Sequence, residues 1–97
     1  VYMVNKIDTA TAFCQILRQQ RMSRGLTHLT LGLKSGFPRK YIYDLEVGNE
    51  HPSLRVVIRL ASALGYSGAG FVTLIERRIE GNDIPPISTL SDHKSNS

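Results

Sequence analysis

Glycines divide segment 25–66 of this chain into three stretches of helical periodicity, and this division constrains the fold more than any other feature. A helix over residues 27–34, a tight turn at Gly36 and a second helix over about residues 39–46 are predicted, because glycine readily adopts the left-handed conformation that ends a helix. Three apolar side chains are spaced to face one another across the turn: Leu31, Ile42 and Leu45. Such a helix-turn-helix holds its second helix where it can enter a DNA major groove.

Three further helices are predicted around this motif. Asp8 or Thr9 caps a first helix that runs to about residue 24. Ser53 begins a fourth and Ser67 a fifth, which runs to about residue 80. Five apolar residues of the fourth helix have the spacing of one helical face: Leu54, Val57, Ile58, Ala61 and Leu64. The predicted fold class is therefore all-α, a compact five-helix domain.

The fifth helix is apolar on more than one side. Phe71, Leu74 and Ile75 form the face that a five-helix domain would bury, and Val72 and Ile79 widen it. A helix of this kind either packs against a partner as well as its own domain, or lies in a deeper core. We choose it as the dimerisation surface, through Phe71, Val72, Ile75 and Ile79.

The composition divides the chain into three parts. Residues 1–8 are expected to form an arm, residues 9–80 the helix-turn-helix domain, and residues 81–97 a disordered tail rich in Ser, Pro, Asn and Asp. The whole chain has 12 Lys and Arg against 8 Asp and Glu, but residues 25–50 carry three of each sign. Modest nonspecific affinity for nucleic acid is therefore expected.

Several other functions are not predicted. The single cysteine, Cys14, excludes an internal disulfide, and the lack of a leader or a long apolar run favours the cytoplasm and argues against a membrane protein. His28, His51 and His93 lie far apart without companions at ligand spacing, so no metal is expected. No nucleophile–base arrangement or glycine-rich phosphate loop is visible, so neither an enzyme nor a cofactor is predicted.

From Arg21 to Tyr66 the chain resembles the Cro/C1-type (XRE-family) helix-turn-helix regulators without gaps. The residues that carry the resemblance are Arg21, Gly25, Leu26, Leu31, Gly32, Gly36, Ile42, Glu46, Gly48, Pro52, Ser53, Leu54, Leu60, Ala61, Ala63, Leu64 and Gly65. The resemblance implies a lambda-repressor-like domain that binds double-stranded DNA. It also implies that Arg21 and Glu46 form a structural ion pair, and that Arg21 reaches a phosphate.

The predicted second helix of the motif offers four outward residues to base edges, because Ile42 and Leu45 are committed to the core. The planar guanidinium of Arg39 matches the O6 and N7 acceptors of guanine, and Lys40 can donate to the same atoms or to a phosphate. Asp44 could accept from a cytosine amino group, or form a surface pair with Lys40 four residues earlier. Tyr43 could pack on a sugar or a thymine methyl, or cover the edge of the domain.

The resemblance also implies phosphate contacts by Thr27 and His28 at the start of the first motif helix, and by Asn49, with His51 beside it, after the second. His28 stands where relatives commonly have glutamine, so DNA binding is expected to depend mildly on pH. Pro38 replaces a usual Ser or Thr, and Ser35 a usual aliphatic residue. Leu29 and Leu33 occupy sites that are usually polar, where they either cover each other or mark a contact with a protein partner.

The leading interpretation is a DNA-binding transcriptional regulator, expected to repress as a homodimer on a palindromic operator, as phage-type repressors or restriction-modification controllers do. Its half-sites would lie about 34 Å apart. Two alternatives share the fold: an antitoxin whose main task is to bind a toxin, and a protein-interaction module without DNA affinity. Only the regulator should combine a sequence preference with a steep loss of affinity in salt.

Overall fold

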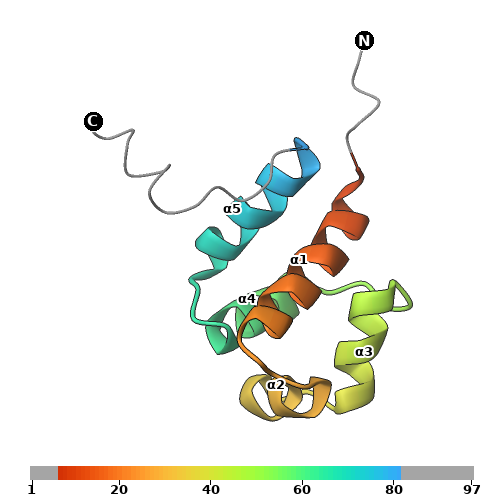
Figure 1. Ribbon diagram of the computed structural model, residues 1–97, viewed down its shortest axis with the longest axis vertical. Coiled ribbons are helices and arrows are strands. Elements are labelled where there is room, and N and C mark those ends of the chain that lie inside the picture. Colours follow the sequence, from red (N-terminus) through yellow and green to blue (C-terminus); the bar gives the residue numbers. More distant parts are fainter. Residues whose placement is uncertain (1–6, 82–97) are drawn as a thin grey trace.

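The computed structural model describes residues 7–81, and over this range the chain consists of five helices joined by short turns (Figure 1). Their bounds are α1 Thr9–Ser23, α2 His28–Ser35, α3 Arg39–Val47, α4 Leu54–Ala63 and α5 Gly68–Ile79. The predicted all-α, five-helix fold is confirmed. The predictions for the arm and the tail fall almost wholly on residues 1–6 and 82–97, which lie outside the described residues.

Side chains fix the starts of four helices. Asp8, Thr27, Ser53 and Ser67 each accept a hydrogen bond from the backbone N–H three residues later, which satisfies one of the free donors of the first turn. The start of α3 differs, because its N-cap is Pro38 and no side chain caps it. The fixed φ of proline is compatible with a helix start, so α3 begins at Arg39 as expected.

A single core joins all five helices. The long α1 packs between α3 on one side and α5 on the other, and α2 packs against α3 and α4 (Figure 1). Phe13 and Phe71 meet edge to face at 6.5 Å between ring centroids and thereby connect α1 with α5. The buried apolar residues are Ala12, Phe13, Ile16, Leu17, Leu31, Ile42, Leu45, Leu60, Ala61, Leu64, Phe71 and Ile75.

The orientation of α4 differs from the predicted apolar face. Leu54 and Ile58 are 71% and 48% exposed, whereas Leu60 is fully buried although it did not belong to the predicted stripe. The helix is rotated so that Leu60, Ala61 and Leu64 face the core. Both faces of α4 are apolar, and only the neighbouring helices decide which of them is covered.

The dimerisation residues predicted on α5 need a similar correction. Phe71 is fully buried and Ile75 is 6% exposed, so both belong to the domain's own core and neither is available to a partner. Val72 is exposed, and Ile79 is a partly buried residue packed against the core. The deeper-core alternative therefore holds for Phe71 and Ile75, and of the four residues only Val72 presents an exposed apolar side chain.

No single helix within residues 7–81 is long and apolar enough to cross a membrane, and α4 and α5 reach that apolar length only as a pair bent by 101°.

Candidate nucleic-acid interface

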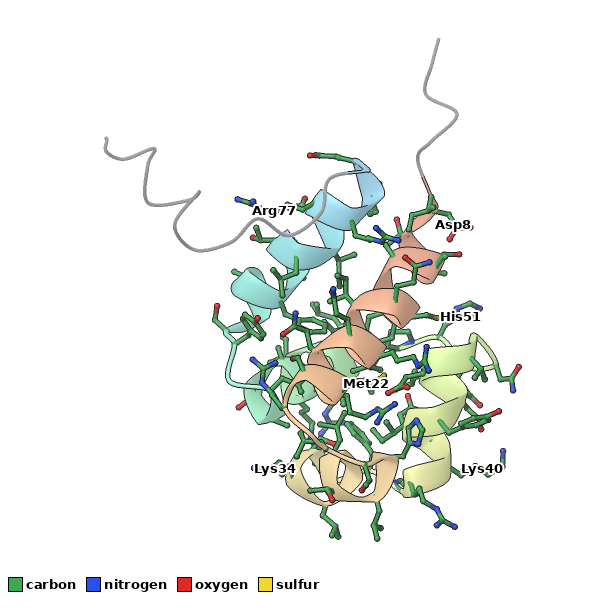
Figure 2. The ribbon with its side chains drawn as sticks, in the orientation of Figure 1. Asp8, Met22, Lys34, Lys40, His51 and Arg77 are labelled. Atoms are coloured by element: carbon green, nitrogen blue, oxygen red, sulfur yellow. The ribbon has the colours of Figure 1, made fainter. Side chains whose placement is uncertain are left out.

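The outer face of α3 is the candidate surface for DNA. Arg39, Lys40 and Tyr43 are exposed on it, while Ile42 and Leu45 on the opposite face are fully buried. This division follows from the helical repeat, because positions 42 and 45 point into the space between α1 and α2. Lys40 extends from the outer side of α3 in Figure 2. The exposure of these three residues agrees with the sequence-based expectation, and their contacts with DNA stay predictions.

The turn between α2 and α3 determines how α3 is presented. Gly36 ends α2 with φ of +87°, and its N–H and that of Phe37 both donate to the carbonyl of Gly32, at 2.7 and 2.9 Å. Arg59 of α4 lies over the Phe37 ring, 4.8 Å from its centroid, and so covers the turn. This contact was missed by sequence reasoning, because nothing in the spacing of the two residues links them.

Arg21 and Glu46 form the predicted ion pair, which holds α3 against α1. The Nε of Arg21 donates to Oε2 of Glu46 at 2.6 Å, and a second guanidinium nitrogen donates to Oε1 at 3.0 Å. The remaining nitrogen donates to the carbonyl of Leu26 at 2.8 Å. The two side chains are 10% and 3% exposed. Three of the five guanidinium N–H groups are engaged inside the domain, so the structure gives Arg21 an orienting role, and its contact with a phosphate stays a prediction.

His28 takes part in the same cluster. Its Nε2 lies 3.1 Å from Oε1 of Glu46, and its ring meets the edge of Tyr43 at 5.7 Å between centroids. Sequence reasoning expected a phosphate contact here and did not foresee these two partners. His28 is the first residue of α2, where the partial positive charge of a helix favours an anion. The proposed phosphate contact is therefore compatible with the position of the residue, although the ring packs against Tyr43 of α3.

Lys40 and Asp44 form an ion pair along α3, with 2.9 Å between Nζ and Oδ2. The hydrogen bond from Lys40 lowers the pKa of Asp44 from its usual value, and the same bond raises the pKa of Lys40. The Asp44 side chain is only 13% exposed. The structure therefore shows the pair with Lys40 that the four-residue spacing left open as an alternative, and the contact of Asp44 with a base stays a prediction.

The remaining predicted phosphate ligands lie at the two ends of the motif. The Thr27 hydroxyl accepts from the Thr30 N–H at 3.0 Å and lies 2.9 Å from the Thr30 hydroxyl, so it serves the helix cap. Asn49 is exposed, and its N–H donates to the carbonyl of Asp44 at 2.9 Å, in the loop that leaves α3. His51 is exposed near the end of α3 that is farther from α2 (Figure 2).

Other titratable groups give no indication of catalysis. Within residues 7–81 no three His, Cys, Asp or Glu residues gather as a metal site would require. The Cys14 thiol donates to the carbonyl of Leu45 at 3.1 Å, and burial raises its pKa. A thiol with a raised pKa is a poor nucleophile at neutral pH, so Cys14 acts here as a packing residue between α1 and α3.

The fold and this surface together define a helix-turn-helix domain in which the outer face of α3 is exposed. A helix-turn-helix family model, HTH_3, matches residues 17–71, more than half of the chain. The chain therefore belongs to the Cro/C1-type helix-turn-helix family, a family of DNA-binding transcriptional regulators.

Three comparisons place the chain among known members. An uncharacterised HTH-type transcriptional regulator, y4dJ of Sinorhizobium fredii, is 38% identical over 53 residues, which cover 55% of this chain and 69% of that protein. The restriction-modification controller protein C.AhdI from Aeromonas hydrophila is 34% identical, with a TM-score of 0.61 over 64% of this chain and 94% of its own. The clp gene regulator ClgR from Corynebacterium glutamicum shares the fold, with a TM-score of 0.69 at 20% identity over 94% of this chain and 90% of its own.

Proposed function

We propose that this protein is a sequence-specific regulator of transcription that represses as a homodimer on a palindromic operator, with α3 in the major groove. The observation that carries the proposal is the outer face of α3: Arg39, Lys40 and Tyr43 are exposed side by side on a helix that Glu46 anchors at its far end. A helix that is fixed on one face and open on the other suits base-edge recognition, because its side chains are held in register with the groove.

Arg39 is the proposed guanine reader. It is the first residue of α3, it is exposed, and no ion pair engages it within residues 7–81. The other cation on the outer face of α3, Lys40, is paired with Asp44. The guanidinium of Arg39 is therefore available for a bidentate contact with O6 and N7 of a guanine. His28 and Asn49 would contact the backbone on either side of it, with Thr27 forming the cap that positions His28.

A second copy of the chain would bind the exposed apolar surface between α4 and α5. An apolar hollow is lined there by Leu54, Val57, Ile58, Gly68, Ala69 and Val72, and three of these side chains are 38–71% exposed. The same patch on each of two copies can meet across a two-fold axis, which is how homodimers usually form. In Figure 1, α3 and α5 lie on opposite sides of α1, so pairing through α4 and α5 would leave α3 open to DNA.

The interaction-module alternative has one observation in its favour. Leu29 and Leu33 on α2 are 51% and 76% exposed and lie one helical turn apart. Two neighbouring exposed leucines can serve as a small contact for a protein partner, whether a toxin or another regulator. They do not occupy the outer face of α3, so a protein contact at α2 is compatible with DNA binding as well as an alternative to it.

The test of this function is a selection of bound sequences from random duplex DNA, carried out with the natural protein, with Arg39→Ala and with Arg77→Ala as a control. Arg77 lies on α5, well away from α3 (Figure 2). We expect an enriched palindrome that Arg39→Ala relaxes at one base pair per half-site, with a loss of about 1–3 kcal/mol of discrimination there, while Arg77→Ala keeps the palindrome.

Two outcomes would contradict the proposal. If the folded natural protein enriches no sequence at moderate salt, the interaction-module alternative takes its place. If Arg39→Ala weakens binding to all sequences equally and reduces the slope of log K against log salt concentration by about one, Arg39 contacts a phosphate and reads no base.

A further inference from the structure

Lys40 and Asp44 make an unequal pair. The lysine side chain is 82% exposed, whereas that of the aspartate is 13% exposed, although both lie on α3 one turn apart. An ordinary pair of this spacing on a helix surface leaves both partners in water, where the attraction is weak and both side chains move freely. Here the Asp44 side chain is mostly covered by the protein, whereas the Lys40 side chain extends into solvent.

The covered carboxylate of Asp44 depends on Lys40 for the compensation of its charge. Oδ2 of Asp44 accepts from Lys40 Nζ at 2.9 Å, Oδ1 is buried, and the Asn49 side chain is the other hydrogen-bonding group beside the carboxylate. A mostly covered carboxylate is costly unless hydrogen bonds and a cation compensate its charge. Lys40 is therefore held beside Asp44 more firmly than its own exposure suggests. The lowered pKa of Asp44, to which Lys40 contributes most and nearby Asn49 less, agrees with this geometry.

The exposed ammonium group of Lys40 lies on the proposed DNA surface. An ammonium group has three donors, and Asp44 Oδ2 occupies one of them. Lys40 is the second residue of α3, next to Arg39, in the turn that a recognition helix directs at base edges. A lysine without a partner at such a site moves readily to the nearest phosphate, since the phosphates carry the charge. A lysine held by Asp44 is kept from that movement and retains two donors for acceptors on the floor of the groove.

We propose that Asp44 is a positioning residue for sequence recognition: it holds the Lys40 ammonium toward adjacent base acceptors, such as O6 and N7 of guanine, and away from the phosphates. This inference rests on the proposed DNA-binding function. It adds Lys40 as a second base-contacting residue beside Arg39. It also explains why a surface for DNA contains a carboxylate. The pair is close to neutral, so it contributes hydrogen-bond selectivity and little general attraction.

The test compares the natural protein with Asp44→Asn, Asp44→Glu and the double variant Lys40→Ala/Asp44→Asn. For each, binding to the selected duplex and to a scrambled duplex is measured over a range of salt concentrations. With Asp44→Asn we expect Lys40 to reach a phosphate. The slope of log K against log salt concentration then becomes more negative by about 0.9, and binding to scrambled DNA tightens. The preference at one base pair falls roughly tenfold. Asp44→Glu keeps the carboxylate and should restore part of that preference.

The double variant keeps the net charge, because it removes one charge of each sign, and it leaves no lysine to orient. We expect it to lose the same single base preference with an unchanged salt slope. If it instead lowers the slope by about 0.9 and keeps every base preference, Lys40 is a phosphate contact and the inference is overturned. The inference is also overturned if folded Asp44→Asn changes neither the base preference nor the salt slope.

These outcomes remain distinct from a failure of the proposed function itself. A natural protein with no sequence preference removes both proposals. A natural protein with a preference that depends on Arg39 but not on the Lys40–Asp44 pair removes only this one. Should Asp44→Asn fail to fold, as circular dichroism would show, the single variant Lys40→Gln carries the test. Loss of one base preference would support the inference, and equal weakening on all sequences would overturn it.

Discussion

Glu46 is a single residue of α3 that connects three helices. Its carboxylate accepts two hydrogen bonds from Arg21 of α1 and lies 3.1 Å from Nε2 of His28 at the start of α2. The side chain is 3% exposed, so these partners, and not water, surround the carboxylate. A buried ion pair of this kind contributes little net stability compared with an apolar pair, but it specifies one orientation of α3 relative to α1 and α2.

Removal of this carboxylate should therefore be costly. We expect Glu46→Ala to lower the free energy of unfolding by about 3 kcal/mol, because the buried guanidinium of Arg21 then lacks its partner. Urea denaturation followed by circular dichroism measures the change. Glu50→Ala is the matched control, since Glu50 is exposed and forms no ion pair within the described residues, and its effect should stay within about 0.5 kcal/mol. Equal effects of the two variants would contradict the orienting role.

At the scale of the elements, α2 and α3 each end at a glycine with the same left-handed backbone conformation, but the two glycines have different surroundings. Gly36 and Gly48 both have φ of +87°. A Cβ at Gly36 would collide with the guanidinium of Arg59, which lies over the Phe37 ring, whereas a Cβ at Gly48 would meet nothing within 4 Å. The first turn is therefore covered by α4, and the second is open.

This difference predicts unequal costs for the same substitution. Gly48→Ala should destabilise the domain by about 1–2 kcal/mol, the cost of the left-handed conformation for a residue with a Cβ. Gly36→Ala should cost about 0.5–1 kcal/mol more, because it displaces Arg59 from the aromatic ring. Chemical denaturation of both variants, alone and with Arg59→Ala, measures the difference. An excess that persists without the arginine would show that its contact with Phe37 is not the cause.

The elements also show how far the sequence determines the structure. The starts of α1, α2, α4 and α5 were predictable because Asp8, Thr27, Ser53 and Ser67 act on the backbone of their own first turn, which is a local effect. The rotation of α4 was not, because Leu54 and Leu60 are equally apolar and only the packing of α2 and α5 against α4 selects Leu60 for the core. Phe71 and Ile75 were predicted to form a dimer interface but are buried in the core. Their burial could not be predicted either, because it also depends on how the neighbouring helices pack.

The candidate site follows the same rule. Exposure of Arg39, Lys40 and Tyr43 could be predicted, because burial of Ile42 and Leu45 fixes the opposite face of one short helix. The orientation of His28 toward Glu46 could not, because it depends on where three separate helices meet. Asp44 illustrates a partial success: its spacing from Lys40 indicated the pair, but its burial depends on the surroundings of α3 in the folded domain.

At the scale of the whole molecule, the proposed DNA face and the proposed dimer surface lie on different helices. Ile58 and Val72 belong to the apolar surface between α4 and α5 and are 48% and 38% exposed. Substitution of these residues can therefore separate assembly from folding. A charged residue at Ile75 cannot do so, because Ile75 lies in the core and the domain itself would be destabilised.

We expect Ile58→Glu and Val72→Glu to leave the helical content unchanged and to raise the dissociation constant of the dimer about thirtyfold or more. Sedimentation equilibrium over a range of protein concentrations measures this constant. Leu33→Glu is the control, because Leu33 is 76% exposed on α2, outside that surface. A dimer that survives both substitutions, or that only Leu33→Glu disrupts, would place the interface elsewhere.

The contact between the first and last helices has a consequence for how the protein is made. Phe13 of α1 packs on Phe71 of α5, and Gln20 of α1 accepts a hydrogen bond from Tyr66 at 2.9 Å. A nascent chain on the ribosome therefore carries the completed motif before α5 has emerged to cover α1. We expect products of early termination to expose the apolar side chains of α1 that α5 covers, such as Phe13, and to be degraded, so that incomplete copies do not accumulate and compete for the proposed operator.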